Sequence, residues 1–369
     1  MKTVKLGEIL ESQNSARRPI KAMDREPGST PYLGASGVVD YVEGFTHDGT
    51  FLCLSEDGEN LRSRKAPVAW VQEGRFWANN HLHVFSGSSK DELKFVQYAI
   101  ESQQLSSYIT GSTQPKLTKA NALSIEVPTL DFESRCTIGS LLSALDEKIA
   151  ANEQVMSISK ELSMSLADSA TGRCALREVA TIYKSPIGVA QMDGKTVTSY
   201  SLPAFDDGWA PRVDGGSIKS GKTLLKQPVV LVSKLNPRIP RIWGVDSLPK
   251  GDSVASTEFV ALVPKSGIKV AHLWAAVSSP DFTKDMLHRV TGTTGSHQRI
   301  TPQSMMEVEV NDPRELTDET KALLESLLRS VNLRAEENQR LARTRDELLP
   351  LLMDGRITVK DAERVVEEA

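Results

Sequence analysis

The sequence predicts a mixed α/β (α+β) protein with two similar globular units, each followed by one long helix, so that the chain is an internal pseudo-two-fold repeat. Three observations support this fold class. Residues 138–167 and 324–353 are alike, and their matching positions lie 186 residues apart in a chain of 369. Both segments space their apolar residues as helices do, and similar runs of short strands, a helix and polar loops precede each of them.

The two long segments share an apolar seam. Residues on a roughly seven-residue a/d repeat form one stripe, and such a stripe needs a facing helix. About 30 residues at 1.5 Å each would form a rod of roughly 45 Å. Each helix could pack on its own globular unit, but the matched pair favours helix against helix. The expected seam residues are Ile138, Leu141, Leu145, Asn152, Val155, Leu162 and Leu166, then Leu324, Leu327, Val331, Asn338, Leu341, Leu348 and Leu352.

Each globular unit is expected to follow one order of elements. A short opening helix comes first, strands separated by Gly, Asp and Asn turns follow, and a helix, a polar loop and a closing strand complete the unit. In the first unit these are helix 4–12, strands 32–33, 37–41, 50–54, 68–71 and 81–85, helix 91–107, loop 111–116 and strand 123–127. In the second they are helix 176–182, loop 186–194, strand-rich runs 197–202, 223–232 and 258–263, helix 270–278, loop 291–298 and strand 306–310, with a strand and helix in the tail 357–368.

Composition limits the class of protein. No run of about 18 apolar residues could span a membrane, and the start of the chain lacks a secretory apolar core. Cys53, Cys136 and Cys174 share no metal-type spacing, so they are expected to be reduced thiols in a cytoplasmic protein.

Charge is distributed unevenly along the chain. The net charge is −4, yet residues 172–313 hold 17 basic and 13 acidic residues. A protein that holds DNA through phosphates alone would need more positive charge. Either this chain does not bind DNA, or partner subunits supply the contacts to the DNA backbone.

Several motifs suggest catalysis without completing it. Residues 216–223 match a Walker A pattern, but no apolar strand precedes them and Pro228 leaves no room for the phosphate-binding helix. Residues 236–239 (NPRI) lack the second proline and the aromatic residue of an amino-methyltransferase motif, and Pro280-Asp281 lacks the rest of a nuclease core. His81 and His83 could share a strand face, but no third metal ligand is evident. The chain is therefore expected to position other components, with no catalytic residue, cofactor or metal of its own.

Two sets of polar loop residues remain as candidates for contact with DNA. Arg and Lys can pair with guanine edges in the major groove, and Asn and Gln with adenine edges. A solvated surface is the alternative for each of them. The candidates are Arg62, Arg64, Lys65, Asn79, Asn80, His81, Gln114 and Lys116 in the first unit, and Lys184, Lys234, Asn236, Arg238, Arg241, His297, Gln298 and Arg299 in the second.

The order of these motifs resembles the DNA-specificity (S) subunit of type I restriction–modification enzymes, over essentially the whole chain. The duplication and the order of the motifs carry the resemblance, and no single motif decides it. The two halves differ in their loop sequences, as the family expects when the two half-sites differ. The matching stretches are residues 32–41 (YLGASGVVDY), 54–58 (LSEDG), 76–81 (FWANNH), 230–238 (VLVSKLNPR) and 255–259 (ASTEF), the spacer-helix pattern 141–152 and the ending 347–357 (ELLPLLMDGRI).

The resemblance implies a division of labour. Residues 1–131 and 172–313 would be target recognition domains, each reading half of a bipartite, asymmetric site in double-stranded DNA. Residues 132–171 and 314–369, the spacer helices and the C-terminal tail, would form an antiparallel coiled coil that sets the distance between the half-sites. Two methyltransferase (modification) subunits would dock on the helices and make N6-methyladenine from S-adenosylmethionine. Restriction subunits that use ATP and Mg would join them for translocation and cleavage.

Two other hypotheses stay open at this point. The chain could be a coiled-coil scaffold that joins the subunits of a defence complex without touching DNA. It could also be a self-contained enzyme that uses the Walker-like loop, which would require the purified protein to bind ATP.

Overall fold

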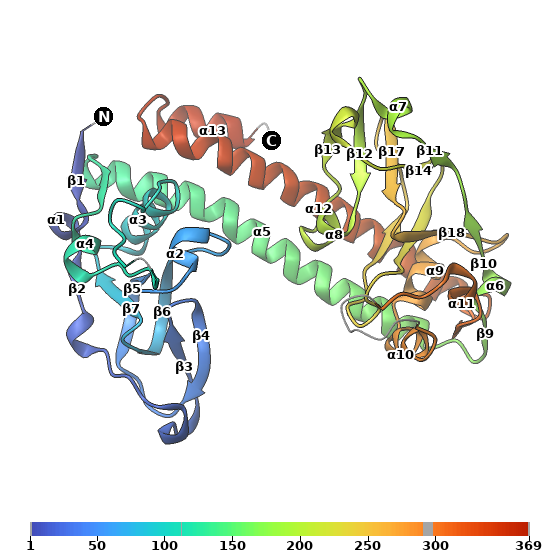
Figure 1. The fold of residues 1–369 in the computed structure, drawn as a ribbon, viewed down its shortest axis with the longest axis horizontal. Coiled ribbons are helices and arrows are strands. Elements are labelled where there is room, and N and C mark those ends of the chain that lie inside the picture. The colour runs from blue at the N-terminus through green and yellow to red at the C-terminus, as the bar shows by residue number, and fades with distance from the viewer. Residues whose placement is uncertain (1, 112, 291–297, 368–369) are drawn as a thin grey trace. The chain divides into compact units, whose positions relative to one another are not determined.

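The computed structural model describes residues 2–111, 113–290 and 298–367 (Figure 1). The chain divides into two compact units, one made of Met1–Lys148 with Arg340–Ala369 and the other of Ile149–Gln339. Each unit thus contains a globular part and a portion of both long helices, α5 (Phe132–Ala167) and α12 (Asp318–Met353). The four-part division at residues 131, 171 and 313 stays a prediction.

The first unit is built on a six-stranded mixed sheet. Its central strands are apolar on both faces because both are covered. Leu52 and Leu54 lie in the core beneath helix α3 (Lys90–Glu101), and Cys53 faces a second cluster with Phe76 and Val84. The sheet order is β2 (Glu11–Ser12), β7 (Leu82–Ser86), β5 (His47–Ser55), β6 (Ala69–Ala78), β3 (Pro27–Gly34) and β4 (Gly37–Val42).

The second unit contains two sheets. The fully buried strand β15 (Val229–Ser233) lies in the middle of the first, with helix α9 (Val270–Val277) against one face. This sheet has the order β10 (Ala180–Tyr183), β18 (Phe259–Pro264), β15 and β16 (Ile242–Val245). The second sheet has the order β11 (Pro186–Ile187), β14 (Lys222–Leu225), β17 (Asp252–Ser256), β12 (Thr196–Tyr200) and β13 (Arg212–Asp214).

Corresponding short elements close the two globular parts. In the first unit β1 (Thr3–Lys5) pairs with β8 (Glu126–Pro128), and in the second β9 (Arg173–Ala175) pairs with β19 (Glu309–Asn311). A four-residue helix follows each opening strand, α1 (Leu6–Ile9) or α6 (Leu176–Val179). A five-residue helix precedes each closing strand, α4 (Lys119–Leu123) or α11 (Pro302–Met306), and a threonine side chain caps both helices. These correspondences confirm the internal repeat.

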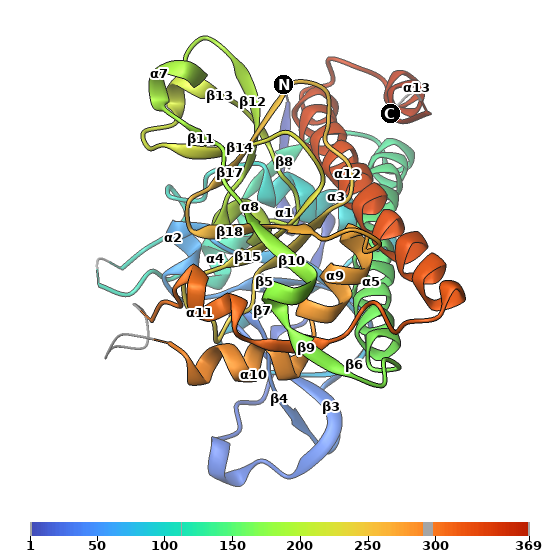
Figure 2. The ribbon, with the colours of Figure 1, turned by 90° about the vertical axis from the view of Figure 1, so that its right-hand side faces the viewer.

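The long helices pack against each other in opposite directions (Figures 1 and 2). In the second unit the Asn152 side-chain amide donates to Asn338 Oδ1 at 2.8 Å and to Glu337 Oε2 at 2.7 Å. In the first unit Arg345 Nη1 donates to Asp146 Oδ1 at 2.5 Å. As α5 advances from 146 to 152 its neighbours on α12 run backwards, so the coiled coil is antiparallel. A buried polar pair of this kind fixes the register of a helix pair.

The seam prediction is wrong in the second half of α5. Val155 and Leu162 are 38% and 42% exposed, whereas Ser159 and Ser163 are buried. Ser163 satisfies its hydroxyl by donating to the carbonyl of Ser159, so it can occupy a closely packed helix interface. After Asn152 the buried face is shifted by one residue from the predicted seam, because Ser159 and Ser163 are buried without carrying a hydrophobic signal.

Several shorter elements also differ from expectation. Both opening helices are only four residues long, since Leu10 and Ala180 are already extended. Short apolar runs do not distinguish strand from helix, and this ambiguity caused most of the errors. Helix α3 ends at Glu101. Leu123 and Met306 are the last residues of helices α4 and α11, so the closing strands begin after them. Ile357 forms no strand and precedes the tail helix α13 (Val359–Glu367). The remaining elements are η1 (Asn14–Ala16), η2 (Ala22–Asp24), α2 (Asn60–Ser63), α7 (Val189–Met192), α8 (Leu202–Asp206), η3 (Gly215–Ser217) and α10 (Pro280–His288). Residues 291–297 of the predicted loop lie outside the described residues.

Gly139 allows α5 to approach α3 in the first unit. A Cβ atom at this position would collide with the carbonyl oxygen of Asp91 and lie 2.8 Å from the Phe95 nitrogen. Both neighbours are backbone atoms, which cannot rotate away. We therefore expect Gly139→Ala to destabilise the first unit by about 2–4 kcal/mol, since overpacking forces backbone shifts.

Urea unfolding of the full chain would measure this effect. The exposed neighbour Ser140, replaced by alanine, serves as the control and should change the free energy of unfolding by less than about 0.5 kcal/mol. Equal midpoints for the two variants would contradict the close packing of α3 on α5.

Candidate nucleic-acid interface

The two globular parts each bring three separate segments together in one backbone arrangement. We call residues 55–58, 79–83 and 114–117 junction 1, and residues 233–241, 256–259 and 298–300 junction 2. In junction 1 the Glu56 nitrogen donates to the His81 carbonyl at 2.9 Å, and the Leu117 nitrogen donates to the Glu56 carbonyl at 2.7 Å. In junction 2 Lys234 takes the place of Glu56, donating to the Glu258 carbonyl at 2.8 Å and accepting from the Ile300 nitrogen at 3.1 Å.

A third hydrogen bond and a shared backbone turn complete the match. The Gly58 nitrogen donates to the Pro115 carbonyl at 3.2 Å, and the Asn236 nitrogen donates to the Gln298 carbonyl at 2.9 Å. Gly58 and Asn236 have φ values of +106° and +48°, a region that Gly and Asn adopt most readily. The junctions are thus equivalent in backbone but carry different side chains.

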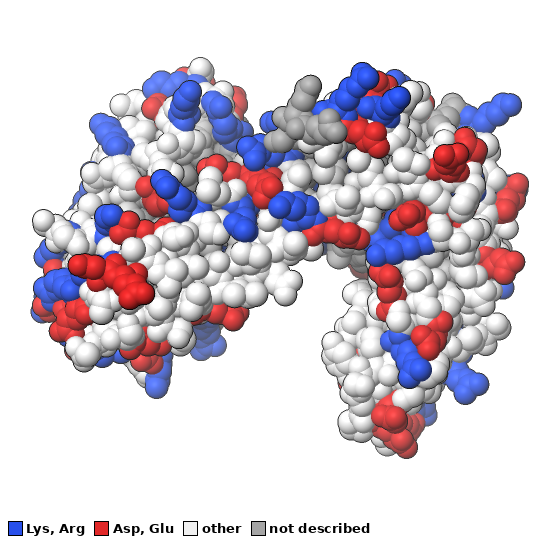
Figure 3. Space-filling view, turned by 180° about the vertical axis from the view of Figure 1, so that it is seen from behind, with Lys and Arg blue, Asp and Glu red and all other residues white. Residues whose placement is uncertain are grey.

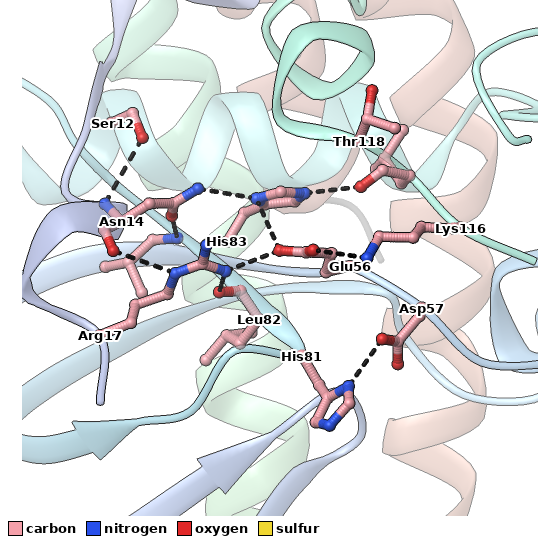
Figure 4. A network of polar contacts seen from close by, with 12 residues as sticks. Ser12, Asn14, Arg17, Glu56, Asp57, His81, Leu82, His83, Lys116 and Thr118 are labelled. Atoms are coloured by element: carbon pink, nitrogen blue, oxygen red, sulfur yellow. Dashed lines mark hydrogen bonds and ion pairs between the residues drawn. The ribbon is translucent and has the colours of Figure 1, made fainter. Parts of the chain in front are cut away.

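Glu56 is the centre of the polar network in junction 1 (Figure 4). Its carboxylate contacts Arg17 Nη1 at 2.7 Å and Lys116 Nζ at 3.3 Å, and His83 Nδ1 lies 3.5 Å away. The paired cations hold the pKa of Glu56 below its usual value although burial opposes this. The carboxylate therefore ties together a loop, two strand ends and the segment before α4.

His83 is fully buried and neutral. Its Nε2 lies 2.7 Å from the Leu117 carbonyl, which can only accept, so Nε2 carries the proton. Nδ1 is then free to accept from the Asn14 amide at 2.9 Å. Burial lowers the pKa of His83 because the charged form is poorly solvated.

This lowered pKa predicts a loss of stability in mild acid. The unfolded chain takes up a proton at histidine near pH 6.5, whereas folded His83 does not until a lower pH. The free energy of unfolding should therefore fall as the pH drops below about 6.5. His83→Gln, which cannot titrate, should make this dependence shallower in thermal unfolding from pH 7.5 to 5.

The exposed His288, replaced by glutamine, is the matched control for that experiment. A pH dependence that is equally steep in His83→Gln and in the wild type would show that His83 does not supply it.

Some of the other candidates in the first unit are exposed to solvent, and the rest bind other residues of the unit. His81 is exposed, with Nδ1 2.6 Å from Asp57 Oδ2, and its backbone nitrogen donates to Asn79 Oδ1 at 2.8 Å. Arg64 is turned into the fold, where it binds the carbonyl and carboxylate of Glu101. Arg62 lies on helix α2, not in a turn, and donates to the Gly111 carbonyl. Lys65, Asn80, Gln114 and Lys116 are exposed.

In the second unit the structure brings most candidates to junction 2. Arg238 is exposed beyond the turn at Asn236, and Lys234 is half-buried. Arg241 forms a two-point ion pair with Asp206, at 2.6 and 2.8 Å, so it is held within the unit. Arg299 contacts Glu258 at 3.1 Å. Lys184 is exposed between β10 and β11, one residue after Tyr183, which pairs with Ala261 on β18. His297 lies outside the described residues.

Junction 2 also contains buried oxygen atoms without hydrogen-bond donors. Asn236 Oδ1, Glu258 Oε2 and Gln298 Oε1 have no partner among the residues that the structure describes. Buried polar atoms are nearly always satisfied in folded proteins, and exceptions call for an explanation such as a binding role. Three such atoms in one junction favour this region as a functional site.

Sequence reasoning missed the acids of both junctions. Glu56, Asp57 and Glu258 stand in the stretches 54–58 and 255–259 that carried the family resemblance, but they were not named as site residues. Arg17 was also missed, because its role depends on contact with Glu56, 39 positions away. The signal that was present was the placement of acids at the ends of predicted strands, since Glu56 and Asp57 follow strand 50–54 and Glu258 begins strand 258–263.

The surface charge and the motifs that suggested catalysis can be compared with the structure. Figure 3 shows acidic and basic side chains interspersed on one face, without a large area of a single sign. Within residues 216–223 the structure has a 3₁₀ turn followed by strand β14, so no phosphate-binding helix follows. No group of three potential metal ligands occurs among the described residues. No helix in the described ranges is long and apolar enough to cross a membrane.

Comparison with known proteins identifies the domain that carries junction 1. Residues 1–157 match the family described as the type I restriction modification DNA specificity domain. The chain carries a type I restriction modification DNA specificity domain. A curated type I restriction enzyme specificity subunit of Haemophilus influenzae is 36% identical over 140 residues. That match covers 38% of this chain and about a third (36%) of the relative's length.

Solved structures show over how much of this chain the likeness in fold extends. The S subunit of a type I restriction–modification system from M. genitalium aligns with a TM-score of 0.66, covering 95% of this chain and 96% of that one. The sequence identity is 14%, so this likeness concerns the fold alone. The HsdS subunit from Thermoanaerobacter tengcongensis aligns over 96% of this chain with a TM-score of 0.31, which is too low to support a conclusion.

Proposed function

We propose that this chain is the DNA-specificity subunit of a type I restriction–modification complex, in which each globular part reads one half of a bipartite, asymmetric DNA site. The observation that carries the proposal is the pair of junctions, which share three backbone hydrogen bonds but not their side chains. A duplicated frame with different side chains suits two readers of different sequences. Exposed Lys, Arg, Asn, Gln and His side chains at strand ends have the chemistry to reach base edges in a major groove.

The division of work with partners belongs to the same proposal. The chain itself would hold no catalytic residue and no cofactor. Two methyltransferase subunits would bind S-adenosylmethionine and methylate adenine N6 after flipping the base, and restriction subunits would use ATP and Mg. Those partners would also supply most contacts to DNA phosphates, which accounts for a specificity subunit with a net charge of −4.

An apolar stripe on α5 supports docking of partner subunits on the helices. Val155, Ile158 and Leu162 are 38%, 54% and 42% exposed and lie three or four residues apart, on one side of the helix. Their repeat equivalents on α12 include Thr344 and Leu348, which are buried in the first unit. A helical stripe left open in one repeat and covered in the other is suited to an amphipathic helix of a partner.

We expect Ile158→Asp to reduce co-purification of the methyltransferase subunit at least ~10-fold, because a charge would then be desolvated in the interface. Thermal unfolding of the chain alone should hardly change, since Ile158 is exposed. The exposed Ile239, replaced by aspartate, is the control outside the helices and should retain the partner. Full retention by Ile158→Asp would exclude this stripe as the docking surface.

A footprint of the co-purified complex on DNA tests the proposed function against a scaffold that never touches DNA. The proposal predicts two protected regions that include the sequence-specific positions, separated by a stretch without base preference. A complex that contains the partner subunits but protects no specific sequence would favour the scaffold.

A further inference from the structure

Each junction holds one cation against one carboxylate at an equivalent place. Lys116 and Arg299 both lie on the third segment, one residue before Leu117 and Ile300, whose nitrogens make the matching backbone bonds. Lys116 Nζ is 3.3 Å from Glu56, and Arg299 Nη2 is 3.1 Å from Glu258. Both cations are therefore restrained at the same point of the repeated frame.

The exposure of the partners differs in a consistent way. The cation side chains are 52% and 58% exposed at Lys116 and Arg299, whereas Glu56 and Glu258 are only 12% and 29% exposed. A carboxylate that is less exposed than the base it pairs with restrains the orientation of that base. Lys has three and Arg five N–H donors, more than one contact with a carboxylate requires. A surface ion pair in which both partners were exposed would not restrain the cation in this way.

The carboxylate approaches from different segments in the two junctions. In junction 1 it belongs to Glu56, at the end of the first strand, where junction 2 has Lys234. In junction 2 it belongs to Glu258, immediately before β18, the strand that pairs with β15; junction 1 has His81 at this place. The carboxylate thus approaches an equivalent cation from a different segment in each junction, so the two cations are held in different directions.

We propose that Glu56 and Glu258 are positioning residues that aim Lys116 and Arg299 at DNA bases, and that the change of side makes the two units read different sequences. This inference rests on the proposed function. Lys116 and Arg299 donate to acceptors on a base edge, with guanine O6 and N7 as the preferred pair. The acids touch no DNA and act through their cations.

The test uses the complete complex of this chain with its methyltransferase subunits and two DNA libraries, each randomised in one half-site. Glu258→Gln keeps the shape of the side chain but removes the charge that restrains Arg299. We expect it to lower discrimination at one base position of the second half-site about 10-fold and to leave the first half-site unchanged. Glu56→Gln should do the converse, and Glu258→Asp should restore part of the lost discrimination.

Two controls separate positioning from folding. Asp252→Asn removes a carboxylate from an exposed ion pair with Lys195 in the same unit and should change neither half-site. Should Glu56→Gln unfold, Lys116→Gln tests the same pair from its exposed side and must alter the first half-site only. Glu258→Gln with wild-type base preferences, or with both half-sites altered together, would overturn the inference. A wild-type complex without any base preference would instead overturn the proposed function.

Discussion

Insertion of seven residues into both α5 and α12 is expected to move recognition to sites with a longer gap and to reduce methylation of the original site at least ~100-fold. Seven residues add about 10.5 Å to each helix, a length that corresponds to about three base pairs of DNA. A heptad also rotates a helix by only ~20° relative to its starting phase, so the seam is preserved. The expected result follows from the proposal that the helices set the distance between the two readers.

The structure indicates where the insertions belong. Placed after Lys148 and after Gln339, they fall at the boundaries between the units. The Asn152–Asn338 pair then stays within the second unit and the Asp146–Arg345 pair within the first. Insertion into α5 alone is the control, because it breaks the helix pairing and should abolish activity at every gap. Methylation assays on DNAs whose half-sites are separated by gaps of increasing length measure the double insertion and the control. If the double insertion still prefers the original gap length, the spacing role of the helices is refuted.

Replacement of Arg238 by alanine is expected to weaken methylation of the cognate site by about 5- to 150-fold, the effect of losing a base contact worth ~1–3 kcal/mol. Arg238 is exposed beyond the Asn236 turn, and its side chain has no partner among the described residues of junction 2. The loss should be accompanied by relaxed preference at one position of the second half-site. The first half-site should keep its preference, because Arg238 belongs to the second unit only.

The exposed Lys250 of the same unit provides the matched control. Lys250→Ala removes a positive charge outside the junction, so it should leave base preference unchanged. Competition assays with DNAs altered in one half at a time distinguish the two variants. Equal loss of preference in both half-sites for Arg238→Ala would contradict independent readers.

The long helices were predictable because their signal is local and repeated. Heptads of leucine and the matched residues Asn152 and Asn338 identified both helices, and the structure confirms α5 and α12 over 36 residues each. The phase of the seam after Asn152 was not predictable, because Ser159 and Ser163 give no apolar signal although both are buried. Local periodicity thus reveals a helix more reliably than the face it buries.

The junctions show the opposite limit. Candidates such as Asn79, Lys116 and Asn236 were found because polar residues at strand ends follow from sequence pattern alone. The pairing of Glu56 with Lys116 joins residues 60 positions apart and appears only when β5, β7 and the segment before α4 meet. Arg64 shows the converse, since a cation in a predicted loop turned into the fold to bind Glu101. Side-chain direction at a loop depends on distant partners that no local pattern records.

A map of methylated adenines in cells that express this chain with its partner subunits tests the central proposal most directly. Two different half-sites separated by a gap of constant length and free sequence are expected. The Arg238→Ala variant should change one half of that motif and leave the other intact. A single uninterrupted motif, or a variant that changes both halves at once, would contradict the proposal that two separate readers act from one chain.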